Sequence, residues 1–246
     1  MQFRQLSPPG SNPCESYATY QELRQASDGD FEQFLSDGER EELRRWRDPA
    51  SREAWLMGRF LSKQLVLSQL GGQWLDPASI EICSHDPQNR RVRPTVRVGG
   101  RLQLWNLSIS HSKTALLAAL SPMPEVAVGV DLTAVEEFSP GFLATWFTKQ
   151  EQVALSVSKP RQTAAYWAIK EAVYKAGNCG ESFAPRRIEI FPKEPGKYCC
   201  FNQGVDLSGI CNVRTWDIDR QVAVVVVLRR KKCIQTDFSG ALNVHQ

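Results

Sequence analysis

Apolar residues recur every three or four positions along two stretches of the chain, and this spacing predicts two long helices. The first is predicted over residues 52–70, after a break at Asp48-Pro49, with Ser51 as its N-cap. The second is predicted over residues 163–176, where small and aliphatic side chains form one apolar stripe. Weaker helical patterns cover residues 31–47 and 142–155.

Short apolar runs around these helices predict strands. They cover residues 79–83, 92–98, 102–107, 116–120, 126–132, 187–191, 213–218 and 221–229. One long helix and several short strands lie on each side of a proline-rich joint at residues 121–124. We therefore predict an α+β fold of two similar lobes, residues 1–124 and 125–246, each a small, mostly antiparallel sheet packed with a long helix. The active site is expected in the cleft between them.

The two ends of the chain lack these patterns. Residues 1–30 are rich in Ser, Pro, Gly and Gln and predict a loosely ordered lead-in, while residues 230–246 predict a disordered tail. The first residues carry no apolar signal-peptide core, and the longest apolar run, Val222–Leu228, is too short to cross a bilayer. Seven cysteines without CxxC spacing indicate reduced thiols. We expect a cytoplasmic protein with no membrane contact.

Charge limits the classes of partner. The formal net charge of +3 is a mild basic excess, which suits an anionic small ligand or an acidic protein. The alternative is a nucleic-acid-binding protein that uses the arginines at 40–47 and 229–232. Three glutamates interrupt the first cluster, and no basic-aromatic stacking motif accompanies either one. We therefore expect no nucleic acid.

Two patterns in the second half could carry chemistry. Asp131 follows the apolar strand in VGVDLT, and Glu171 and Lys175 are four residues apart at the edge of the apolar stripe of the second long helix. The two carboxylates could hold Mg²⁺ against a diphosphate. The alternative is a turn aspartate and a surface Glu–Lys pair.

Two further patterns in the first half suit phosphate. The turn SHSK places Ser110 and His111 among other donors, although a turn histidine that bonds backbone is an open alternative. On the first long helix, Arg52, Arg59 and Lys63 share one face with apolar neighbours, which suits a bound anion. The alternative there is an outer basic face whose apolar stems cover the surface.

Taken in order along residues 35–230, these motifs resemble the 4′-phosphopantetheinyl transferase superfamily. The motifs are Arg52 with Gly58-Arg59, VRP at 92–94, SHS at 110–112, GVD at 129–131, FTxxE at 147–151 and WxxKEAxxK at 167–175. The length resembles the pseudo-dimeric, single-chain group of that family. The resemblance implies a monomeric, Mg²⁺-dependent enzyme of holo-[acyl-carrier-protein] synthase type. It would transfer the phosphopantetheine arm of coenzyme A to a serine of an acyl or peptidyl carrier protein.

The resemblance also implies roles for single residues. Asp131 and Glu171 correspond to the magnesium ligands and, with Lys175 on the coenzyme A diphosphate, to the catalytic residues. Ser110 and His111 correspond to the phosphate-binding turn, Arg93-Pro94 to an element near the adenosine, and Arg52 to a basic residue on the phosphates. Arg59 and Lys63 are expected to join Arg52 because they share its helix face.

The sequence departs from the family at several positions. Thr133 replaces a second acid, Val92 replaces a glycine, and Leu107-Ser108 replaces an aromatic-Asn pair. Thr133 favours an alternative in which the chain is a non-catalytic relative that binds only coenzyme A or a carrier protein.

Overall fold

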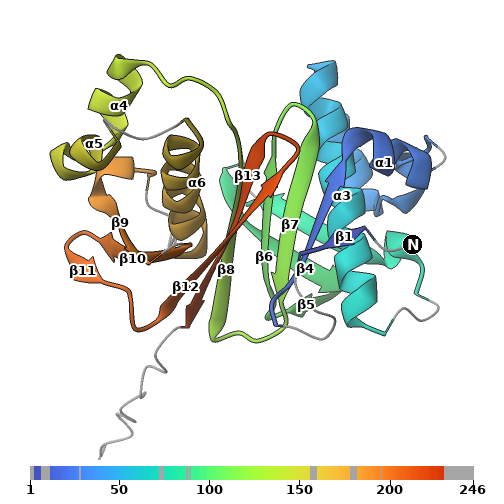
Figure 1. Ribbon diagram of the computed structural model, residues 1–246. Helices are drawn as coiled ribbons and strands as arrows, with labels where there is room; N and C mark the ends of the chain where they lie inside the picture. The colour runs from blue at the N-terminus through green and yellow to red at the C-terminus, as the bar shows by residue number, and fades with distance from the viewer. Residues whose placement is uncertain are drawn as a thin grey trace, which may run out of the picture.

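The computed structural model describes residues 3–6, 12–27, 29–71, 75–86, 88, 90–155, 160–177, 182–194 and 196–229. Its elements form a mixed α+β fold with four small antiparallel sheets (Figure 1). The two longest helices of the described residues are α3 (Pro49–Gln69) and α6 (Pro160–Gly177). They lie on opposite sides of the central strands. The α+β fold class is therefore confirmed.

Two sheets lie between these helices. The first has the order β1-β2-β7-β6 and packs against α3, and the second has the order β12-β13-β8 and packs against α6. Their strands are β1 (Arg4–Gln5), β2 (Cys14–Thr19), β6 (Asn106–His111), β7 (Ala115–Ser121), β8 (Val126–Ala134), β12 (Cys211–Ile218) and β13 (Gln221–Arg229). β6 also contacts β8, so the two sheets meet along that edge.

Burial on both faces explains why β7 is apolar up to Ser121 and why β13 is apolar between Gln221 and Arg229. Leu116 of β7 faces α3, whereas Leu117 faces the second sheet. Val224 of β13 faces α6, whereas Val225 faces the first sheet. Both strands are thus buried on two faces, which a continuous apolar run permits and an alternating one does not.

Two three-stranded meanders and several short helices complete the fold. The meanders are β3 (Ile80–His85), β4 (Arg91–Val98) and β5 (Arg101–Gln103), and β9 (Ile188–Glu194), β10 (Lys197–Asn202) and β11 (Val205–Asp206). The short helices are α1 (Tyr20–Ala26), η1 (Glu32–Phe34), α2 (Asp37–Leu43), η2 (Pro77–Ser79), α4 (Pro140–Trp146), α5 (Lys149–Leu155) and η3 (Pro185–Arg187). No helix in the described part of the chain is long and apolar enough to cross a membrane.

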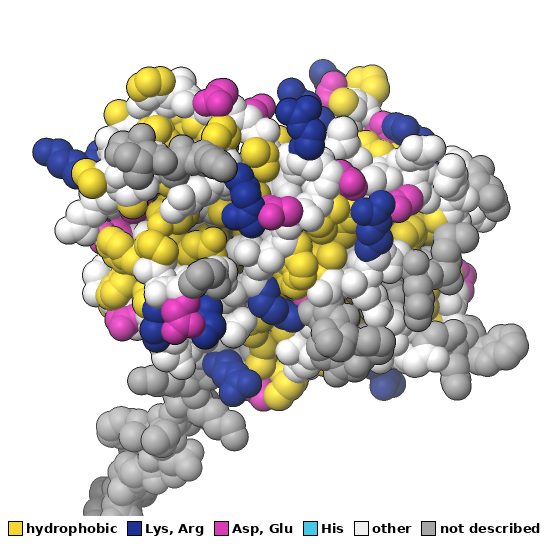
Figure 2. Space-filling view, viewed as in Figure 1, with side chains coloured by type: hydrophobic (Ala, Val, Ile, Leu, Met, Phe, Trp, Pro, Cys, Tyr) yellow, Lys and Arg dark blue, Asp and Glu magenta, His cyan; other side chains and the backbone are white. Residues whose placement is uncertain are grey.

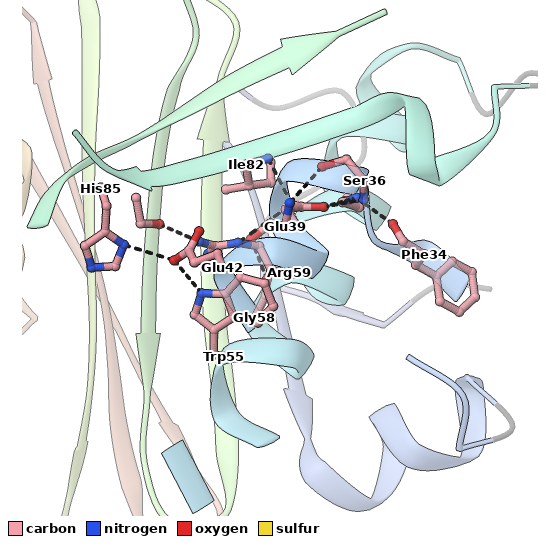
Figure 3. Close-up of polar contacts among 12 residues, drawn as sticks. Phe34, Ser36, Glu39, Glu42, Trp55, Gly58, Arg59, Ile82 and His85 are labelled. Atoms are coloured by element: carbon pink, nitrogen blue, oxygen red, sulfur yellow. Dashed lines mark hydrogen bonds and ion pairs between the residues drawn. The ribbon is translucent and has the colours of Figure 1, made fainter. Parts of the chain in front are cut away.

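The same order of elements occurs twice. A strand, short helices, a long helix, a 3₁₀ turn, a three-stranded meander and two further strands run from β2 to β7, and again from β8 to β13. A buried Glu–Lys pair recurs in the same place. Glu39 pairs with Lys63 at 2.5 Å and accepts the Ile82 backbone N–H at 3.0 Å (Figure 3). Glu151 pairs with Lys170 at 2.8 Å and accepts the Ile190 N–H at 2.9 Å.

Each of these glutamates also closes a capping box. Ser36 and Glu39 exchange side-chain and backbone hydrogen bonds at the start of α2, and Thr148 and Glu151 do so at the start of α5. In each run, a single carboxylate therefore caps a short helix, accepts the backbone N–H of the third residue of a meander strand and neutralises a lysine of the long helix. The two Glu–Lys pairs fix the short helices and meanders to α3 and α6.

Several predictions of secondary structure need correction. The lead-in prediction is wrong for residues 12–27, which form β2 and α1; Tyr17 and Ala18 are fully buried there. α3 begins at Pro49, because proline is tolerated at the first helical position. Asp48, rather than Ser51, is therefore its N-cap, and the Asp48 side chain accepts the Ser51 N–H. The helix predicted over 142–155 is two helices, and the strand predicted over 102–107 is split between β5 and β6. The predicted tail lies outside the described residues.

Charged side chains are interspersed on the surface. On the face shown in Figure 2, basic and acidic side chains alternate around apolar areas in the middle of the molecule. Several surface charges form exposed pairs, such as Arg24–Glu53 and Arg161–Asp217. Such pairs cancel much of the local field, in line with the small net charge.

Candidate active site

The end of β8 places a carboxylate against α6. Val128 and Val130 point into the core between the sheets, so the alternate residues Gly129 and Asp131 point towards the helix. Asp131 is only 4% exposed. Its position at the edge of the sheet, beside β6, brings it within reach of side chains from three elements.

Gly129 allows the helix to approach the strand at this point. A Cβ at this position would lie 1.9 Å from the Ala172 carbonyl oxygen and 2.6 Å from the Ala176 nitrogen. No side chain fits there without moving backbone. The glycine therefore sets the depth at which α6 packs, and with it the distance from Asp131 to the residues of α6.

We predict that Gly129→Ala destabilises the protein by about 1–3 kcal/mol, because the added methyl group forces α6 away from β8. Urea unfolding would measure this loss. Gly141→Ala is the matched control, since a Cβ there meets nothing closer than the Ser139 Oγ at 3.9 Å. Equal stability for both variants would show that α6 does not pack on Gly129 as described.

Charged and hydroxyl groups converge on Asp131. The Lys175 Nζ donates to the Asp131 Oδ1 at 2.8 Å and lies 3.4 Å from a Glu171 carboxylate oxygen. The Ser110 hydroxyl, from β6, donates to the same Oδ1 at 2.8 Å. The Thr133 hydroxyl donates to Oδ2 at 2.7 Å. Residues separated by more than sixty positions in the sequence thus form one cluster, which we call the Asp131 cluster.

The two carboxylates of the cluster differ in their proton affinity. Burial alone would raise the pKa of Asp131, but the charge of Lys175 and hydrogen bonds from Lys175, Thr133 and Ser110 bring it below its usual value. Burial and the neighbouring Asp131 charge raise the pKa of Glu171 to about 7, and Lys175 only partly opposes them. Near neutral pH the cluster therefore holds one ionised carboxylate and one that is about half protonated.

In metal-free protein, the stability contribution of Glu171 should be lost as pH rises. A glutamate of ordinary pKa, 4.5, loses its proton in the unfolded chain well before the folded protein does, at about 7. The contribution is fully present below 4.5 and disappears through about 7. Glu171→Gln removes this titration, so wild type should lose about 2 kcal/mol relative to the variant between about pH 5 and pH 8.

Denaturant unfolding in the presence of a chelator, at a series of pH values, measures this difference. Glu194→Gln serves as the control because that carboxylate is exposed and pairs only with Lys197 among the described contacts. Parallel pH profiles for wild type and Glu171→Gln would contradict the raised pKa.

Comparison with known proteins finds a family model that matches part of the chain. Residues 127–226 match the family model described as the 4′-phosphopantetheinyl transferase superfamily. The match covers less than half of the chain, within its second half. The matched segment contains Asp131, Glu171 and Lys175, whereas Ser110 precedes it.

A solved structure is also similar to part of the chain. It is the Thermotoga maritima holo-[acyl-carrier-protein] synthase (AcpS), at 25% sequence identity and a TM-score of 0.35. The likeness covers 43% of this chain and 64% of that chain, which is less than two thirds of its length. No curated protein matches this chain.

The other predicted residues lie at different distances from the Asp131 cluster. His111 ends β6 and is exposed, next to Ser110. Arg93 on β4 donates to the Val128 carbonyl at 3.0 Å and to the Ala176 carbonyl at 3.4 Å. It therefore lies against β8 and α6, the two elements that carry Asp131 and Lys175. Pro94 follows it in β4 and is half-buried.

The prediction that Lys63 binds a ligand is corrected by the structure. Its side chain is fully buried, pairs with Glu39 and donates to the Phe34 and Pro77 carbonyls. A bound anion would have to displace this carboxylate from a closed site. Lys63 is therefore a structural residue, equivalent in its contacts to Lys170.

Arg59 is also held within the protein. It is 3% exposed, donates to the Ser84 hydroxyl at 2.9 Å and stacks at 4.5 Å over the Trp55 ring (Figure 3). Its guanidinium lies 3.5 Å from the Glu42 carboxylate. This placement corrects the expectation that Arg59 meets a ligand from solvent.

Arg52 remains accessible. It pairs with Glu32 at 2.6 Å and lines a cavity of about 240 Å³. The remaining residues of this cavity are Arg40, Leu43, Arg44 and Trp46. No contact among the described residues joins this cavity to the Asp131 cluster. The three basic residues of this helix face therefore lie in three different environments.

Sequence reasoning missed two features. It did not anticipate that Thr133 and Ser110 would hold Asp131, because both contacts depend on how β6 and β8 meet. It also passed over Lys170, which lies next to Glu171 but is fully buried. The [ST]-x-x-E spacing at Ser36-Glu39 and Thr148-Glu151 was the available signal, since it marks capping boxes.

Proposed function

We propose that this chain transfers the 4′-phosphopantetheine group of coenzyme A to a serine of an acyl or peptidyl carrier protein and releases 3′,5′-ADP. The observation that carries the proposal is the Asp131 cluster, with Asp131, Glu171 and Lys175 inside the segment that matches the superfamily. The match of residues 127–226 to the superfamily model supports phosphopantetheinyl transfer in general. The cluster supplies the charged groups that transfer of a phosphoryl group requires.

Asp131 and Glu171 are the residues that we propose to hold Mg²⁺. The two side chains are neighbours, and the Asp131 charge helps to raise the pKa of Glu171, as expected when two acids share a site without a cation. Magnesium sites commonly use one or two carboxylates with substrate phosphates and waters. The cation would neutralise negative charge on the diphosphate when bound.

The protein ligands of this proposed site number two. No group of three His, Cys, Asp or Glu residues that could hold a metal ion occurs among the residues described here. Thr133 stands where a second acid would otherwise add to Asp131, and its hydroxyl is a neutral ligand at most. Phosphate oxygens and waters are proposed to complete the shell.

Lys175 is the residue that we propose to contact the transferred phosphoryl group. Its ammonium lies between the Asp131 carboxylate and the Ser110 hydroxyl, at 2.8 and 3.2 Å. In the reaction, the carrier serine oxygen bonds to the phosphorus, and the bond from that phosphorus to the 3′,5′-ADP oxygen breaks. The serine proton passes to Glu171 or to a water. Lys175 would stabilise the negative oxygens throughout.

The rest of coenzyme A is proposed to bind to basic and polar residues of the first half. Ser110 and His111 end the strand that borders Asp131, and Arg93 lies against the backbone of β8 and α6. Arg52 adds an accessible guanidinium beside a cavity that two other arginines line. These positions suit phosphate oxygens, which arginine and hydroxyl donors bind well.

Mass spectrometry of apo-carrier proteins tests the proposed function. Each carrier is incubated with the full chain, coenzyme A and Mg²⁺, and a mass increase of one phosphopantetheine is expected. A carrier whose acceptor serine is alanine is the matched control and should not change. If no carrier in a broad panel gains mass while coenzyme A still binds, the chain is the non-catalytic relative that Thr133 favours.

Position 133 offers a test of the metal assignment. Because the Thr133 hydroxyl already contacts Asp131, Thr133→Glu should place a third carboxylate in the Asp131 cluster. Stronger attraction for the cation should lower the Mg²⁺ concentration needed for half-maximal transfer, roughly tenfold for about 1.4 kcal/mol of added binding. Repulsion should lower metal-free stability. An unchanged Mg²⁺ requirement would remove position 133 from the metal site.

A further inference from the structure

Two cysteines from different sheets are brought together by one folded-back connection. Cys200 lies on β10, and the β10–β11 hairpin returns the chain so that the Leu207 N–H donates to the Cys200 carbonyl at 2.9 Å. The next turn places the Cys211 N–H against the Leu207 carbonyl at 2.8 Å. Both backbone contacts share Leu207, so Cys200 and Cys211 become neighbours although ten residues separate them.

The side chains of the two cysteines meet as well. Their thiols are within hydrogen-bonding reach, and both belong to the apolar cluster that α6 packs against. Cys200 is 1% exposed, whereas Cys211 is partly exposed at the start of β12. Cys199 precedes Cys200 on β10 and points to the opposite side of the strand, because side chains alternate along a strand.

We propose that Cys200 and Cys211 form a reversible disulfide when the protein meets a two-electron oxidant such as a peroxide. Cys211 reacts first because it is the accessible thiol. Its sulfur attacks the peroxide O–O bond, giving a sulfenic acid and one water. The Cys200 thiol then displaces the hydroxyl oxygen as a second water and forms the S–S bond. Two thiols are oxidised, and one peroxide is reduced to two waters.

The electrostatics of the pair support this order. Hydrogen bonding to Cys200 lowers the pKa of Cys211, against the opposing effect of burial, so Cys211 carries the greater thiolate character. The pKa of Cys200 is raised by that same contact and by burial. The structure thus distinguishes an attacking thiol from a protected partner.

The disulfide would join the second meander to the central sheet. β10 pairs with β9, and β9 is held to the Glu151–Lys170 pair by the Ile190 N–H and the Ile188 carbonyl. β12 pairs with β13. Oxidation would close a ring of the residues from Cys200 to Cys211, which restricts the unfolded chain and should raise the melting temperature by several degrees. This inference does not depend on the proposed function.

Peptide mapping of the full chain tests the proposal. Purified protein is treated with hydrogen peroxide, its free thiols are alkylated, and it is cut before aspartate without reduction; Asp206 separates the two cysteines. Wild type should give a peptide pair joined at Cys211 that dithiothreitol releases. Cys199→Ser is the matched control and should keep the cross-link, while Cys200→Ser and Cys211→Ser should lose it.

The variants also make the pairing unambiguous. The peptide that holds Cys200 runs from Asp131 to Val205 and also contains Cys179 and Cys199. A cross-link retained in the double variant Cys179→Ser, Cys199→Ser therefore identifies Cys200 even if another variant fails to fold. Loss of the cross-link in Cys199→Ser would assign it to Cys199 and overturn the proposal. Alkylation of both cysteines after oxidation, or overoxidation of Cys211 without a cross-link, would overturn it equally.

Discussion

Asp131→Ala is expected to lower the rate of phosphopantetheinyl transfer by at least about 10³-fold, the scale on which loss of a preorganised electrostatic group acts. The substitution removes a proposed metal ligand and the carboxylate that holds Lys175, Ser110 and Thr133 in place. Lys175 would lose its nearest counter-charge and turn towards Glu171. Initial rates with a carrier protein at saturating and limiting Mg²⁺ measure the effect.

Asp217→Ala is the matched control for this variant. Asp217 lies on β12 of the same sheet but is exposed and pairs with Arg161, so its removal should leave transfer near the wild-type rate. Far-ultraviolet circular dichroism should show the same secondary structure for both variants. Near-full activity of Asp131→Ala at limiting Mg²⁺ would reject Asp131 as a metal ligand.

Lys170→Ala is expected to lower the free energy of unfolding by about 3–5 kcal/mol, because it leaves a buried charge without its partner. The Lys170 ammonium pairs with Glu151 at 2.8 Å and donates to the Pro185 and Ile188 carbonyls. Both side chains of the pair are fully buried. The substitution would strand the Glu151 carboxylate and two carbonyl oxygens away from water.

Guanidinium unfolding of the variant measures this loss, and Lys197→Ala is the comparison. Lys197 also pairs with a glutamate, Glu194, at 2.6 Å, but both side chains are largely exposed. The exposed pair should contribute no more than about 1 kcal/mol. If the two variants unfold at the same denaturant concentration, burial of the Lys170 pair does not govern its contribution.

The sequence located the Asp131 cluster because its three central residues stand on strongly patterned elements. β8 and α6 have clear periods, which placed Asp131 on a strand and Glu171 and Lys175 on a helix, and the resemblance assigned the three to one site. The distances among them did not follow. They depend on Gly129, whose missing side chain lets α6 approach, and on β6 lying beside β8.

Helical spacing gave a wrong prediction for two of the three basic residues on α3, which are buried instead of facing a ligand. Arg52, Arg59 and Lys63 share a helix face, but a face can be covered by other elements along part of its length. α2 supplies Glu39 and Glu42 to the buried end of that face, while the start of α3 stays open. Composition misled at residues 12–27, where a few buried side chains outweigh many polar ones.

The recurring Glu–Lys pair gives an internal register for comparing the two runs of elements. Superposing Lys63 on Lys170 sets Gln64 against Glu171 and Ser68 against Lys175. The anchoring ion pair is present in both copies, whereas the charges of the Asp131 cluster are present in one. The two runs of elements therefore share a scaffold contact, and they differ in the charges that we propose to act on the phosphoryl group.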